Sequence, residues 1–361
     1  MRALEHNLVH HIPTILWSAP GMGKTAEILY LAKKYNRFLG VYIPTHHEPA
    51  DTGGWPWLSP EGHHKHVPPE LAELLIASGN GILFIDEFST ANYSLQAPLL
   101  RLINERYWGD LKLPDSISII VAGNPPDTSA GTYYLSAAAA NRLVHLDYQL
   151  NQAEWCANFP NYWGDEPGKP DLNMDGWRMW RARLAGYIHS RPQALHVLPK
   201  SEAHRGGAWP SPRSWDLFSQ CCADLDPHTE IDLVAEFGAG CIGEAHSQEC
   251  LIYLLDFDLP DPALSLKNPE KFRLPKRGDQ AYAVLSAIVA HTLNTLTPDI
   301  FLAAWTIMGI AYKQNAGDLV MATAEPLANA YRRNSTLPLP EKELQKIIPL
   351  LELVFKLKGK S

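Results

Sequence analysis

Apolar residues follow two different patterns along the chain. In the first 150 residues, short apolar runs alternate with longer stretches that have apolar residues at helical spacing. The short runs predict β-strands at residues 14–17, 41–45, 82–85, 117–122 and 143–146. This alternation is typical of a parallel sheet with helices on both faces.

After about residue 170 the pattern is almost entirely helical. We expect helices at residues 177–188, 215–223, 231–237 and 249–255, with three or four more between residues 279 and 357. Residues 158–172 are rich in Pro, Gly and Asn, and residues 260–275 form a second linker-like stretch. We therefore predict an α/β core over residues 1–157, an all-α domain over 158–260 and a helical C-terminal extension over 261–361.

The strongest candidate for chemistry follows the first predicted strand. Residues 18–25 read Ser-Ala-Pro-Gly-Met-Gly-Lys-Thr and open a predicted helix. Backbone N–H groups of such a loop, together with the helix N-terminus, hold a polyphosphate. Gly21 and Gly23 give the backbone the required freedom. Lys24 would contact the β and γ oxygens of a nucleoside triphosphate, and the Thr25 hydroxyl would bind Mg²⁺.

The loop departs from the usual pattern at its first position, where Ser18 stands in place of glycine. Serine enters the region of positive φ only at a cost. We therefore expect a slightly altered start of the loop, with the phosphate contacts of its second half retained. A glycine-containing loop alone is also compatible with an ordinary turn.

A second motif strengthens the prediction of a nucleotide site. Residues 82–85 are all apolar, which is typical of a central strand buried on both faces, and Asp86 and Glu87 follow directly. Open α/β sheets bind ligands at the carboxyl ends of their strands. We expect Asp86 to orient Mg²⁺ and Glu87 to polarise the attacking water as a general base. The alternative is a solvated acidic turn.

The predicted contacts of ATP combine both motifs. They are Pro20, Gly21, Met22, Gly23, Lys24, Thr25, Ala26 and Asp86.

Further motifs suggest a family. The predicted strand at 117–122 leads to Asn124, Arg142 precedes the last predicted strand, and residues 209–215 read Trp-Pro-Ser-Pro-Arg-Ser-Trp. With the two motifs above, the chain from about residue 12 to residue 215 resembles the MoxR-like branch of the AAA+ ATPases. The resemblance implies a P-loop NTPase (AAA+) fold: a three-layer αβα core with a parallel five-stranded sheet, then an all-α lid and a helical C-terminal extension.

The resemblance also implies roles for three residues. Asn124 corresponds to the sensor-1 residue that helps to position the lytic water. Arg142 corresponds to the arginine finger that reaches the γ-phosphate of a neighbouring subunit, and Arg213 to the sensor-2 arginine of the lid. Cations placed where charge spreads suit phosphoryl transfer. Alternatives remain open: Asn124 would also suit the start of a turn, and Arg101 or Arg106 could supply the cation in trans.

The segment at residues 45–56 also resembles an acidic, glycine- and proline-containing segment of MoxR-like proteins, which tends to face the pore of the ring or a partner. His63, His64 and His66 follow it. No cysteine or second histidine pair lies nearby at ligand spacing. We therefore expect loop histidines and no metal site.

Composition limits the remaining choices. A chain of 361 residues that is 46% hydrophobic and 19% charged is a folded protein of two or three units without a long disordered tail. A net charge of −8 argues against nucleic acid as the main partner. Five cysteines without a CxxC pair, and no signal peptide in residues 1–12, predict the cytoplasm. The apolar stretches 281–289 and 301–311 are too short to span a membrane.

The resemblance implies a Mg²⁺-dependent ATPase that forms a homo-oligomer, expected to be a hexamer. Members of the branch act as chaperone-like factors that remodel or activate a partner protein, commonly one with a von Willebrand factor A domain. Two other functions stay open. One is a scaffold whose assembly is switched by nucleotide, and the other is a motor subunit stimulated by nucleic acid.

Overall fold

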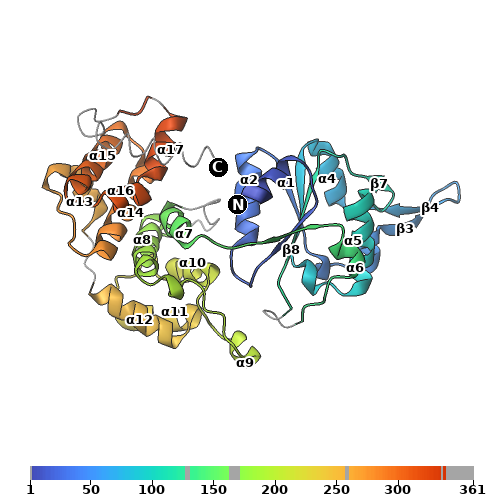
Figure 1. The fold of residues 1–361 in the computed structure, drawn as a ribbon, viewed down its shortest axis with the longest axis horizontal. Helices are drawn as coiled ribbons and strands as arrows, with labels where there is room; N and C mark the ends of the chain where they lie inside the picture. Colours follow the sequence, from blue (N-terminus) through green and yellow to red (C-terminus); the bar gives the residue numbers. More distant parts are fainter. Residues whose placement is uncertain (1, 127–130, 162–170, 257–259, 335, 339–361) are drawn as a thin grey trace. The chain divides into compact units, whose positions relative to one another are not determined.

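The computed structural model describes residues 2–126, 131–161, 171–256, 260–334 and 336–338 of the chain. The chain forms two compact units, Met1–Leu150 and Asn151–Ser361 (Figure 1). The first unit is α/β and the described part of the second is helical.

The first unit is built on a five-stranded parallel sheet with the strand order β2-β5-β8-β1-β9. The strands are β1 (Thr14–Trp17), β2 (Phe38–Tyr42), β5 (Gly81–Ile85), β8 (Ser118–Gly123) and β9 (Val144–Asp147). Every residue of β5 and β8 is buried, because these strands are covered on both faces. The carboxyl ends of β5, β8 and β1 consequently lie side by side at one edge of the sheet.

Helices cover both faces of the sheet. Helices α1 (Arg2–Val9) and α2 (Lys24–Lys34) pack on one face, where they meet Ile82 and Phe84 of β5. Helices α4 (Glu70–Ser78) and α5 (Tyr93–Glu105) pack on the other, against Leu83 and Ile85. Successive residues of a strand point to opposite faces, so the single apolar run of β5 supplies both cores.

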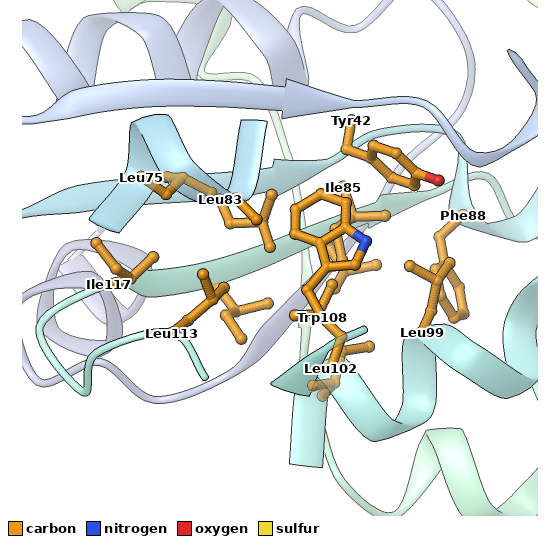
Figure 2. Packing of buried hydrophobic residues seen from close by; sticks show 14 of the residues in the cluster. Tyr42, Leu75, Leu83, Ile85, Phe88, Leu99, Leu102, Trp108, Leu113 and Ile117 are labelled. Carbon is orange, nitrogen blue, oxygen red and sulfur yellow. The ribbon is translucent and has the colours of Figure 1, made fainter. Parts of the chain in front are cut away.

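Trp108 lies at the centre of the second of these cores. Figure 2 shows its indole among Ile85, Leu99 and Leu102, with the Tyr42 ring nearby. The two rings meet edge to face with centroids 4.9 Å apart. Trp108 belongs to the short hairpin of β6 (Tyr107–Trp108) and β7 (Leu111–Lys112) that links α5 to β8.

The predicted fold class is confirmed: a three-layer α/β core with a five-stranded parallel sheet is followed by a helical region. One strand was predicted wrongly. The second strand covers Phe38–Tyr42 and not residues 41–45, because Pro44 has no N–H group to donate to a ladder. The chain instead forms a 3₁₀ helix at Pro44–His46.

The segment that follows forms a short helix and a hairpin. Helix α3 (Pro49–Gly53) leads into β3 (Trp55–Leu58), which pairs with β4 (His64–Val67). His64 and His66 therefore lie on an exposed strand, and the expectation that they are loop residues is wrong. In the described part of the chain, no group of three or more His, Cys, Asp or Glu side chains is arranged to hold a metal ion.

The hairpin is fixed at its base by close backbone contacts. A Cβ atom added to Gly109 would lie 2.3 Å from the carbonyl oxygen of His66, and one added to Gly54 would lie 2.7 Å from Gly109 Cα. The Asp110 N–H donates to the His66 carbonyl at 2.9 Å, and the His66 N–H donates to Asp110 Oδ2 at 2.7 Å. The base of the hairpin is thus closely packed and hydrogen-bonded to the turn between β6 and β7.

The second unit is an assembly of helices. Its described helices are α7 (Gln152–Asn158), α8 (Met174–Ser190), α9 (Glu202–Arg205), α10 (Pro212–Cys221), α11 (Ile231–Ile242), α12 (Glu244–Leu255), α13 (Pro262–Lys267), α14 (Gly278–Thr295), α15 (Pro298–Lys313), α16 (Gly317–Thr323) and α17 (Glu325–Arg333). Helix α8 packs along α14. Trp177, Trp180, Trp215 and Trp305 are fully buried, so these tryptophans serve core packing.

The boundary between the units falls at residues 150 and 151, seven residues before the predicted end of the core at 157. The further division into a lid over 158–260 and an extension over 261–361 stays a prediction. Residues 162–170 of the predicted linker, the lid end at 257–259 and the predicted helix beyond residue 338 lie outside the described residues. Within the described ranges, no helix has the length and apolar character that crossing a membrane requires.

The packing of α8 predicts that a Gly→Ala change in this helix destabilises the protein, although alanine usually stabilises a helix. A Cβ atom at Gly176 would lie 1.8 Å from the carbonyl oxygen of Ala223, which belongs to the backbone and cannot easily move away. Gly176→Ala should therefore lower the free energy of unfolding by about 1–3 kcal/mol in chemical denaturation. In the matched variant Gly240→Ala, the new methyl group of α11 meets nothing within 4 Å. It should raise stability by about 0.5–1 kcal/mol, and equal effects of both changes would contradict this packing.

Candidate phosphate and magnesium site

The candidate site lies at the carboxyl ends of three adjacent strands, β5, β8 and β1. The loop at residues 18–23 joins β1 to α2, Asp86 follows β5, and Asn124 follows β8. Side chains from all three positions are connected by hydrogen bonds. The sheet therefore brings together residues that are far apart in the sequence.

The loop has the backbone of an anion-binding turn. Gly21 and Gly23 have φ values of 75° and 90°, in the left-handed region that favours glycine. A Cβ atom at Gly23 would meet nothing within 4 Å, so the requirement is conformational and not steric. Gly23 is also the N-cap of α2 and makes no side-chain cap hydrogen bond, so this helix begins at a position that suits an anion.

Lys24 is the centre of a hydrogen-bond network. Its side chain is buried, and Nζ donates to Asn124 Oδ1 at 2.8 Å, to Ser18 Oγ at 2.9 Å and to the Ser18 carbonyl at 3.2 Å. Ser18 is not among the residues with positive φ, so replacing glycine there strains nothing. The departure from the usual motif instead supplies a hydroxyl that holds the lysine.

Thr25 and Asp86 form the second connection. Thr25 Oγ1 donates to Asp86 Oδ2 at 2.7 Å, and the Glu87 N–H donates to Asp86 Oδ1 at 2.9 Å. A hydroxyl and a carboxylate side by side are hard oxygen donors, which suit Mg²⁺. Because Mg²⁺ takes few protein ligands and completes its shell with phosphate oxygens and water, this small donor set fits the ion.

Glu87 has a strained backbone. Its φ and ψ are 55° and 30°, a left-handed conformation that costs a residue other than glycine about 1–3 kcal/mol. The conformation turns the chain from β5 into the 3₁₀ helix at Phe88–Thr90 and leaves the Glu87 side chain exposed beside Asp86. Strain of this kind is typically found at functional sites.

Asn124 is held in a fixed orientation. Its N–H donates to the hydroxyl of Ser89, which is fully buried, at 2.9 Å. Its Oδ1 accepts from Lys24, so Nδ2 is the atom of the amide that can donate to a ligand. Sequence reasoning missed Ser89. Ser89 lies four positions after the apolar run 82–85, in the short 3₁₀ helix, and no motif in the sequence marks it.

Three other predicted contacts lie on the loop or at the start of α2. Pro20 precedes Gly21 in the loop, Met22 packs against the core beneath α2, and Ala26 is exposed in the first turn of that helix.

Arg142 lies on the surface of the first unit, after the short helix α6 (Ala137–Ala140). Its Nη1 donates to the Ala138 carbonyl at 2.8 Å. Among the described contacts, none joins Arg142 to the residues around Lys24.

The two alternative arginines are differently placed. Arg106 Nη2 donates to the carbonyl oxygens of Pro114 and Asp115 at 3.0 and 3.1 Å, and its Nε lies 3.3 Å from the Asp115 carboxylate. These bonds give Arg106 a structural role in the loop before β8. Arg101 donates to the Gly109 carbonyl at 3.2 Å and lies 3.4 Å from Glu105.

Arg213 belongs to the second unit. It is exposed in the first turn of α10, after Ser211, whose Oγ caps the N–H of Ser214 at 3.2 Å. The first turn of this helix has no acidic residue to offset the arginine charge. A cation is unfavourable at a helix N-terminus, so an anionic ligand would relieve this arrangement.

No protein-family profile and no curated protein sequence matches the chain. Similar solved structures include a candidate ATPase from Cytophaga hutchinsonii, at 16% identity over 70% of this chain and 87% of that one, with a TM-score of 0.31. NtrX from Brucella abortus is 13% identical over 70% of this chain and 66% of its own, with a TM-score of 0.30. RuvB from Thermotoga maritima, a Holliday junction branch migration motor, is 16% identical over 84% and 83%, with a TM-score of 0.33. At 13–16% identity these similarities concern the fold alone.

The geometry predicts that Lys24 is required for nucleotide binding. Lys24→Ala should lower the affinity for ATP by at least about tenfold, since it removes a charge-assisted contact to the phosphates. Isothermal titration calorimetry with ATP and Mg²⁺ measures the change. Lys33→Ala, an exposed position on the same helix, is the control and should bind as the wild type does. Unchanged binding by Lys24→Ala would contradict the assignment.

Proposed function

We propose that this protein binds ATP together with Mg²⁺ and hydrolyses it to ADP and phosphate. The observation that carries the proposal is the convergence of three strand ends through two hydrogen bonds, Lys24 to Asn124 and Thr25 to Asp86. A phosphate-binding loop, an acidic pair and a polar amide meet where open α/β sheets bind ligands. A solvated acidic turn would not require the Thr25 hydroxyl to bond to Asp86.

The residues divide the work of binding. The backbone N–H groups at the start of α2 and the Lys24 ammonium hold the phosphates, while Thr25 and Asp86 hold Mg²⁺. The ion, when bound, neutralises charge on the β and γ oxygens. The hydrogen bonds of Lys24 to Ser18 and Asn124 hold its charge at the mouth of the loop before nucleotide arrives.

The residues around the acidic pair carry the hydrolysis. Glu87 accepts a proton from a water molecule whose oxygen attacks the γ-phosphorus, and the bond from that phosphorus to the β–γ bridging oxygen breaks, so that ADP leaves. Asn124 donates from Nδ2 to hold this water in line. Positioning of this kind is most of what phosphoryl transfer requires from a protein.

We further propose that the chain is a MoxR-like AAA+ ATPase that works as a ring, expected to be a hexamer. Arg142 would act in trans on the γ-phosphate of the neighbouring subunit, and its exposure supports this role. The structural bonds of Arg106 favour Arg142 over that alternative. Residues 158–260 would be the lid that presents Arg213, and residues 261–361 the C-terminal extension.

We propose that the ring remodels or activates a partner protein in the cytoplasm, with a separate protein containing a von Willebrand factor A domain as the expected class. The hairpin of β3 and β4 supports a protein partner. Trp55, Trp57 and Leu58 are each more than half exposed on it, and its base is hydrogen-bonded to the turn at Asp110. The net charge of −8 makes nucleic acid the less favoured partner.

Glu87→Gln should separate binding from hydrolysis. The amide keeps the shape of the side chain but cannot accept the proton, so kcat should fall by about 10²–10⁴-fold while ATP affinity is retained. A coupled ATPase assay and calorimetry measure the two quantities. Glu73→Gln, on the exposed surface of α4, is the matched control. Wild-type turnover by Glu87→Gln would exclude Glu87 as the base. If the wild-type protein itself binds ATP without any turnover, the alternative of a nucleotide-switched scaffold is supported.

Arg142→Ala should reduce kcat by about 10³-fold or more, as expected when a trans arginine finger is lost. Because the finger comes from another subunit, the wild-type rate per subunit should rise with protein concentration up to full assembly. The ATPase rate across a dilution series, followed together with mass by light scattering, measures both effects. If Arg101→Ala abolishes activity and Arg142→Ala does not, the finger is Arg101.

A further inference from the structure

His145 connects two parts of the first unit that have different roles in the proposed reaction. One is the start of the phosphate loop, and the other is the turn that carries Arg142. It is the second residue of β9 and pairs in register with Ile15 of β1. Its Nδ1 lies 3.0 Å from Trp17 Nε1, and its Nε2 lies 2.9 Å from the carbonyl oxygen of Ala140. The Trp17 and His145 rings are stacked with an interplanar angle of 28°.

The two neighbours determine how the imidazole is protonated. The indole N–H of Trp17 can only donate, so Nδ1 of His145 must accept. The Ala140 carbonyl can only accept, so Nε2 must donate. The arrangement therefore requires the tautomer with its proton on Nε2, in which both ring nitrogens are bonded in opposite senses.

Trp17 ties this histidine to the nucleotide site. It directly precedes Ser18, which holds Lys24 through its carbonyl and hydroxyl. Its ring also lies against Gly123, where a Cβ atom would come within 2.9 Å of Trp17 Cζ3. Gly123 precedes Asn124, the other acceptor from Lys24.

Ala140 ties the histidine to Arg142. Ala140 ends α6, and the last carbonyl groups of a helix have no partner within it. His145 supplies a partner for one of them, in the turn where the Arg142 N–H donates to the Ala139 carbonyl at 3.1 Å. Ala139 and Leu143 anchor the same turn in the core, so Arg142 is presented from a short and well-fixed segment.

We propose that His145 is a positioning residue for Arg142. Its two hydrogen bonds attach the turn that carries Arg142 to Trp17, the last residue of β1. This inference rests on the proposed function, because it assigns Arg142 a role in trans. It adds that a subunit's own phosphate loop and the arginine it offers to its neighbour are joined by one imidazole ring. In this role His145 acts through Arg142 and not on the nucleotide itself.

Two variants remove the connection and keep an aromatic ring at the changed position. His145→Phe keeps an aromatic ring beside Trp17 but has neither hydrogen bond, and Trp17→Phe keeps an aromatic ring but lacks the indole donor and part of the ring that packs on Gly123. We expect kcat to fall by about 10- to 100-fold in His145→Phe, through misplacement of Arg142, with unchanged affinity for ATP. The double variant should be no slower than His145→Phe alone, since both changes break one connection. His228→Phe, an exposed histidine of the second unit, is the control.

Mixed assemblies show which side of the site is damaged. Glu87→Gln subunits cannot hydrolyse ATP but carry an intact arginine and Trp17–His145 pair. Mixing them with His145→Phe subunits should restore hydrolysis in the latter, as it should for Arg142→Ala subunits. If Arg142→Ala is rescued and His145→Phe is not, the histidine acts on its own subunit's phosphate loop, and the positioning role is overturned.

The experiment also separates this inference from the proposed function. Absence of ATPase activity in the wild type would overturn the proposed function and this inference with it. Additive losses in the double variant, or wild-type kcat in His145→Phe, would overturn the inference alone. If His145→Phe lowers the Tm markedly, the same mixing with Trp17→Phe, which loses one donor atom, decides the question.

Discussion

The arrangement of the site depends on a buried lysine. An ammonium group removed from water must find acceptors, and Lys24 finds them in Ser18 and Asn124. These residues follow β1 and β8, so the bonds are possible only because those two strands are neighbours in the correct register. The strand order of the sheet therefore determines which polar side chains can accept hydrogen bonds from Lys24.

The sheet meets this constraint with very few polar side chains in its interior. Strands β5 and β8 are buried on both faces, and their alternating residues fill two separate cores. Trp108 fills the centre of one core (Figure 2). It belongs to the hairpin of β6 and β7, which carries no site residue. The packing behind the strand ends fixes the positions of Asp86 and Asn124, as the proposed catalysis requires.

How much could be read from the sequence depended on whether the signal was local. The central strands were predictable because burial on both faces produces a continuous apolar run. Strand β2 was misplaced because its apolar residues continue past the point where Pro44 ends the ladder. The hairpin of β3 and β4 was missed because its residues are exposed on both faces and show no apolar alternation. The phosphate loop and the acidic pair were visible from spacing, whereas the bond of Trp17 to His145 joins residues 128 positions apart.

The orientation of the Asn124 amide has a consequence for the stereochemistry of the proposed reaction. With Oδ1 bonded to Lys24, the amide offers a hydrogen to a water molecule, and the Glu87 carboxylate can only receive one. A water held between them has one lone pair and one proton already engaged. The remaining lone pair is then confined to the two unfilled tetrahedral positions of the water, which narrows the line of attack on phosphorus before the bond to the leaving group weakens in the proposed reaction.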